Sequence, residues 1–117
     1  MMHNKRTWSV AKVDREKLIE ALIHGNWCSC QGWECEGYLF LNDQTSPDGA
    51  GEWGVLKVDN ISKQLESITF GWCEPDHVKQ YVEEAIAGQY DDCDFGYIGV
   101  RREQLDYSPK HRCGLCA

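Results

Sequence analysis

The chain lacks any long apolar segment. Hydrophobic residues make up 42% of its 117 residues, but no run of them approaches the roughly 20 residues that a membrane-spanning helix needs. The N-terminal residues 1–6 lead into a strand-like segment and not into the apolar core of a signal peptide. We therefore expect a cytoplasmic protein with no membrane partner.

The sequence also lacks the common catalytic motifs. It contains no phosphate-binding glycine loop, no Ser/His/Asp signature and no paired zinc-protease histidines. These absences favour a protein that is not an enzyme.

Basic side chains are scarce as well. The chain has 12 Lys and Arg residues against 19 Asp and Glu residues, which gives a net charge of −7. The acidity is concentrated in residues 74–94, which carry one basic and seven acidic side chains. A field of this sign repels phosphate backbones, so direct nucleic-acid binding is disfavoured and a basic protein surface is the more compatible partner.

The hydrophobic pattern predicts a mixed fold in one domain, residues 1–117. Asp14 is suited to cap a helix, and Pro75 suits the first turn of a second one. We expect strands at 7–13, 37–41, 53–58, 65–72 and 95–101, and helices at 14–24 and 75–88. The fold class is therefore α+β, a two-layer sandwich with an antiparallel-rich sheet of about five strands and two helices in the order β-α-β-β-β-α-β. An irregular tail that contains cysteine follows.

Seven cysteines are present, and five of them cluster in two short segments. Residues 26–35 hold three, and the tail holds a pair with two residues between them. Thiolates at such spacing suit a tetrahedral zinc ion, so the sequence predicts one structural zinc that joins the tail to the body. The predicted ligands are Cys28, Cys30, Cys35, Cys113 and Cys116, with His111 in reserve.

Three alternatives to this zinc site remain open. The cysteines could be buried thiols that pack as small apolar residues, or they could form disulfides, although an odd number cannot pair completely. They could also be the function itself, in a protein that handles thiols or metal. A less favoured alternative is a small cysteine enzyme built on Cys73 and His77, which lie one helical turn apart at the start of the second helix.

The acidic segment supplies the main functional hypothesis, which is a non-catalytic protein that binds a basic surface on a protein partner. Small acidic inhibitors, including immunity proteins and phage-encoded inhibitors of nucleic-acid enzymes, use this physics to occupy sites meant for phosphate. The comparison is an analogy from charge and size. The predicted partner-binding residues are Asp76, Glu83 and Glu84 on the second helix, Asp91, Asp92 and Asp94 in the loop after it, and Trp27 and Trp33 as interface anchors.

Overall fold

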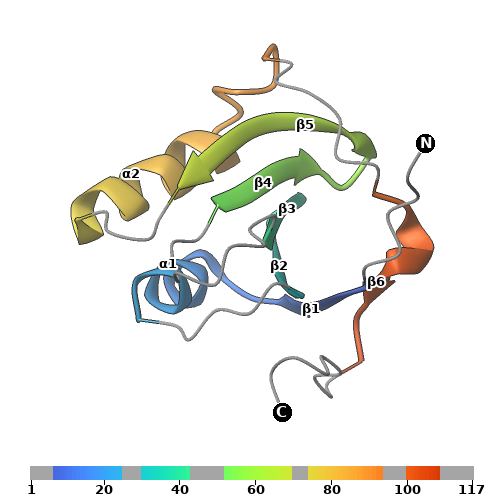
Figure 1. Ribbon diagram of the computed structural model, residues 1–117. Helices are drawn as coiled ribbons and strands as arrows, with labels where there is room; N and C mark the ends of the chain where they lie inside the picture. Colours follow the sequence, from blue (N-terminus) through green and yellow to red (C-terminus); the bar gives the residue numbers. More distant parts are fainter. Residues whose placement is uncertain (1–6, 25–29, 43–51, 70–73, 94–99, 109–117) are drawn as a thin grey trace.

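The computed structural model describes residues 7–24, 30–42, 52–69, 74–93 and 100–108. These residues form two α-helices, a short 3-10 helix and a strongly curled six-stranded sheet (Figure 1). In chain order the elements are β1 (Trp8–Lys12), α1 (Arg15–His24), β2 (Gln31–Cys35), β3 (Tyr38–Asn42), β4 (Glu52–Lys57), β5 (Asn60–Thr69), α2 (Pro75–Ile86), η1 (Arg102–Gln104) and β6 (Leu105–Asp106).

The sheet is mixed, with the strand order β5-β4-β3-β2-β1-β6. The strands from β2 to β5 form an antiparallel meander, whereas β1 pairs in parallel with β2 on one side and with β6 on the other. The parallel pairing of β1 and β2 requires a crossover between them, and α1 lies in that connection.

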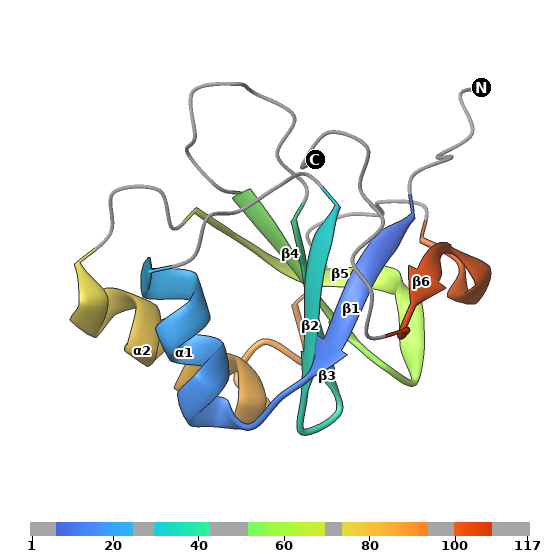
Figure 2. The same cartoon turned by 90° about the horizontal axis from the view of Figure 1, so that it is seen from below.

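Both helices cover one face of the sheet and lie side by side (Figure 2). Leu18 and Leu22 of α1 and Val78, Val82 and Ala85 of α2 are buried against apolar side chains of β2, β3, β4 and β5. In α2 these buried positions recur every three or four residues, so most of the remaining positions face solvent, although Ile86 also packs on the core. This packing determines which side chains of α2 can reach a partner.

The opposite face of the sheet curls around a second, smaller core. Its members come from β1, β3, β4, β5 and the segment before η1: Trp8, Val10, Leu39, Leu41, Leu56, Ile61 and Val100. Because β3 contributes to both cores, all five of its residues are buried. Gly32 lets β2 approach this core closely, since a Cβ there would lie 2.7 Å from Leu41 Cδ2.

The α+β content and the two helices are as expected, but the sheet differs from the predicted one. It has six strands among the described residues and includes two parallel pairings, so the five-stranded, antiparallel-rich sandwich is not confirmed. The added strands are β2, which occupies residues 31–35 of the expected cysteine loop, and the two-residue β6. Residues 95–99 of the predicted last strand lie outside the described residues, and residues 100 and 101 are not in a strand.

Candidate partner-binding surface

The outer side of α2 carries exposed carboxylates. Asp76 lies in its first turn, where the helix dipole favours a negative charge, and Glu83 follows two turns later. Asp92, in the turn after the helix, is exposed as well. None of these three carboxylates makes a hydrogen bond or ion pair within the described part of the chain. Their charges therefore remain available to a partner.

Two other predicted partner-binding residues have internal partners instead. Asp91 accepts a hydrogen bond from Tyr38 Oη at 2.9 Å and pairs with Lys57 Nζ at 2.9 Å. The hydrogen bond from Lys57 is the main reason why the pKa of Asp91 is lowered. This carboxylate thus ties the turn after α2 to β3 and β4.

Glu84 is likewise bonded within the chain. Tyr90 Oη donates to Glu84 Oε1 at 2.6 Å, and Gln80 Nε2 donates to Oε2 at 3.1 Å. These two donors lower the pKa of Glu84, and burial together with the Glu84 carboxylate raises the pKa of Tyr90. Glu84 and Asp91 are therefore engaged by side chains of the chain itself. The acidic surface that is available to a partner is limited to Asp76, Glu83 and Asp92 within the described residues.

A groove of about 490 Å³ runs between α1 and α2. Arg15, Glu16 and Ile19 line it from α1, and Lys79 and Glu83 line it from α2. Ile19 is half-buried and packs on the helix-covered core, so the groove combines an apolar surface with charged walls.

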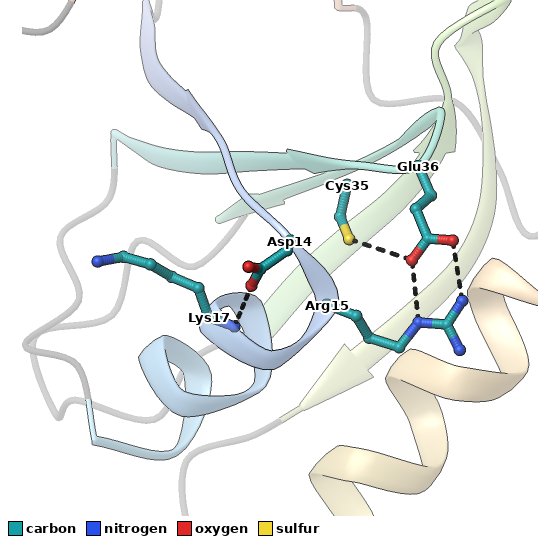
Figure 3. A network of polar contacts seen from close by, with 5 residues as sticks. All are labelled: Asp14, Arg15, Lys17, Cys35 and Glu36. Atoms are coloured by element: carbon teal, nitrogen blue, oxygen red, sulfur yellow. Dashed lines mark hydrogen bonds and ion pairs between the residues drawn. The ribbon is translucent and has the colours of Figure 1, made fainter.

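A polar network fixes one wall of this groove (Figure 3). Arg15 donates two hydrogen bonds of 3.0 Å to the Glu36 carboxylate, so the first turn of α1 is joined to the β2–β3 turn. This bidentate pair lowers the pKa of Glu36 and raises that of Arg15. Asp14 caps α1 by accepting a 2.8 Å hydrogen bond from the backbone N–H of Lys17, as the sequence predicts.

The predicted zinc ligands are not brought together in the part of the structure that is described. Cys30 immediately precedes β2 and Cys35 ends it, so extended chain separates their Cα atoms by roughly 15 Å. Two thiolates on one zinc ion lie only about 4 Å apart. Cys30 and Cys35 therefore cannot both bind the same zinc ion. Residues 28, 113 and 116, and the reserve ligand His111, lie outside the described residues.

Cys35 belongs instead to the helix-covered core. It is 1% exposed, and burial raises the pKa of its thiol to about 11, with the adjacent Glu36 carboxylate adding to the effect. Within the described residues, no group of three or more His, Cys, Asp or Glu side chains is placed to hold a metal ion. Cys35 is a free, buried cysteine, a placement that agrees with the alternative of a buried thiol.

The prediction that Trp33 is an exposed interface anchor is wrong. Trp33 is 9% exposed and stacks on Trp53, with ring centroids 5.1 Å apart. Its position in β2 turns it toward the helices, where aromatic stacking stabilises the core. The other proposed anchor, Trp27, lies outside the described residues, as does Asp94.

The described residues give no support to the alternative of a cysteine enzyme, because they do not include both of its candidate residues. His77 is exposed in the first turn of α2, and Cys73 lies outside the described residues.

Sequence reasoning missed the pairs that position this surface, Arg15 with Glu36 and Lys57 with Asp91. The two residues of each pair are 21 and 34 positions apart in the sequence, respectively. No local sequence pattern indicates contacts over such separations. The positive φ of Glu36, followed by Gly37, indicates the tight turn that brings the first pair together.

No protein-family model matches the chain, and neither a curated protein nor a solved structure matches it. Within the described residues, no helix is both long and apolar enough to cross a membrane.

Proposed function

We propose that this protein is a non-catalytic binding protein that recognises a basic surface on another protein through α2 and the turn that follows it. The observation that carries the proposal is the set of three exposed carboxylates, Asp76, Glu83 and Asp92, which make no hydrogen bond or ion pair in the described part of the chain. Glu83 is near enough to Arg15 to raise the pKa of that guanidinium. Such charges steer association with a basic surface and give specificity. The partner would be a protein that normally binds phosphate, such as a nucleic-acid enzyme, and the acidic surface would occupy its phosphate site.

A charge-matched pair of variants tests this proposal. Asp76→Lys/Glu83→Lys reverses two charges on α2, whereas Asp59→Lys/Glu103→Lys reverses two exposed charges in the β4–β5 turn and in η1. Both variants change the net charge from −7 to −3. Each protein is immobilised, exposed to an extract of the cells that make it, and the captured proteins are quantified by mass spectrometry.

The α2 pair should lose the captured partner, and the control pair should retain it. Circular dichroism should be unchanged in both variants, because all four positions are exposed. Thermal unfolding of the α2 pair should shift downward by only a few degrees, since a lysine at position 76 is unfavourable in the first turn of the helix. Equal capture by the two variants, or no captured partner with the wild type, would contradict the proposal.

We retain the zinc site only as a narrower structural proposal, with Cys30 joined by Cys28, Cys113 and Cys116. Cys30 is half-buried at the start of β2, where its carbonyl accepts the backbone N–H of Ser9. Such a site would suit the reducing, cytoplasmic location that we expect. Native and denaturing mass spectra of the reduced protein should differ by one zinc ion, and Cys113→Ser/Cys116→Ser should abolish the difference. Equal masses for the wild type would rule the site out.

A further inference from the structure

The groove between α1 and α2 borders the acidic surface, because Glu83 belongs to both. Its volume of about 490 Å³ is large enough for a protruding side chain, and the groove is open to solvent. Ile19 of α1 provides a half-buried apolar surface in the groove. An occupant would therefore need a long apolar stem as well as a polar end.

The charges on the walls favour a cationic end. Arg15 is held by the bidentate contact with Glu36, which offsets its charge. The remaining charged side chains are two carboxylates, Glu16 and Glu83, against the single ammonium group of Lys79. Among the lining residues Arg15 and Lys79 balance Glu16 and Glu83, so the net negative charge of the group comes from Glu36, the partner of Arg15.

From this geometry we propose that the groove receives an Arg or Lys side chain of the basic partner. The alkyl stem packs on Ile19 while the cationic end lies between Glu16 of α1 and Glu83 of α2. Long basic side chains are suited to such a site, since they bury an apolar stem and keep a charged head accessible. This inference rests on the proposed function and specifies the chemical group that the surface recognises.

The probe for this site is N-acetyl-arginine amide, which has an arginine side chain and no other charge. Binding is followed by NMR on the isotopically labelled full chain. Saturable shifts are expected for Ile19, Lys79 and Glu83. Absence of saturable shifts at these residues would overturn the inference.

Three neutralising variants test the electrostatics. Glu16→Gln and Glu83→Gln should each weaken probe binding by up to about fivefold, the effect expected of an exposed ion pair. Glu20→Gln is the matched control, since Glu20 is exposed on α1 but lines a different hollow with Lys17 and His24; it should leave affinity unchanged. Unchanged affinity in both groove variants would overturn the proposal.

Lys79→Gln should change the affinity for the probe in the opposite direction. Removal of this positive charge should strengthen binding of the cationic probe. Weaker binding would contradict a cation site and would indicate an anionic occupant.

Failure of this inference is distinguishable from failure of the proposed function. If the probe does not bind but Asp76→Lys/Glu83→Lys still abolishes capture, the acidic surface stands and the groove does not. If the probe binds but capture is the same in the two charge-matched variants, the groove stands and the proposed function does not.

Discussion

Cys35 shows how the surroundings of one residue decide its chemistry. Its clustering with Cys28 and Cys30 suggests a metal ligand, but its position at the end of β2 directs the side chain into the core beneath the helices. The cysteine pattern alone could not reveal this, because it does not show that the segment between Cys30 and Cys35 is extended. Trp33 is misjudged for the same reason, since it lies in the same strand and faces the same core.

The raised pKa of Cys35 predicts slow alkylation. At pH 7.5, iodoacetamide should alkylate Cys35 of the native protein more slowly than Cys93, which is only half-buried. The reason is that a buried thiol is both inaccessible to the reagent and protonated. Peptide mapping by mass spectrometry measures both rates. In urea the two rates should converge, and a Cys35 that reacts as fast as Cys93 in the native state would contradict its place in the core.

At the scale of elements, α1 and the β2–β3 hairpin position the groove. The start of α1 was predicted from Asp14, since an N-cap acts within a few residues of the chain. The hairpin was not predicted, because β2 has weak alternation and its two turn residues, Glu36 and Gly37, resemble a loop. Both have positive φ, at 51° and 89°, which is the geometry of the tight turn that joins neighbouring antiparallel strands.

The cap should make a measurable contribution to stability. Asp14→Ala removes the acceptor for the N–H of Lys17 and should lower the free energy of unfolding by about 1 kcal/mol. Asp14→Asn keeps an acceptor oxygen and should retain most of that stability. Urea unfolding compares the variants, and equal losses would show that the cap bond is not the cause.

The hairpin turn makes a matching prediction. Gly37→Ala should destabilise the protein by about 1 kcal/mol, because a Cβ strains the backbone at positive φ although no atom lies within 4 Å of it. Gly37→Asn should cost less, since Asn tolerates this region. If both variants unfold at the urea concentration of the wild type, the turn does not have the described geometry.

At the scale of the whole molecule, the sheet curls around one core while the helices cover another. The two helices and the strands β1, β3, β4 and β5 were predicted from periodicity, at least in part, because burial of one face imposes a regular pattern. The parallel pairing of β1 with β2 and β6 was not predicted, since it depends on contacts between residues that are distant in sequence. The acidic surface was predicted in position but overestimated in extent, because hydrogen bonding to Tyr38 and Tyr90 is invisible in the sequence.

The contacts of Asp91 with Tyr38 and Lys57, which we call its tether, predict how stability depends on pH. A carboxylate with a lowered pKa stabilises the fold above its unfolded pKa, about 3.9 for Asp, and this contribution is lost as the pH falls through the folded value. Asp91→Asn should therefore reduce the loss of stability between pH 6 and pH 3 by less than about 1 kcal/mol, the range for exposed pairs. Asp92→Asn, the neighbour without a tether, should leave this loss unchanged. An identical pH dependence for Asp91→Asn and the wild type would show that the tether does not stabilise the fold.

The most direct test of the binding surface is carboxyl footprinting of the complex with the captured partner. A carbodiimide labels exposed carboxylates in the free protein, and mass spectrometry then reports which of them the partner covers. We predict that Asp76, Glu83 and Asp92 lose labelling in the complex, whereas Asp59 and Glu103 keep it. Protection of Asp59 and Glu103 with full labelling of the α2 carboxylates would place the interface elsewhere and contradict the account.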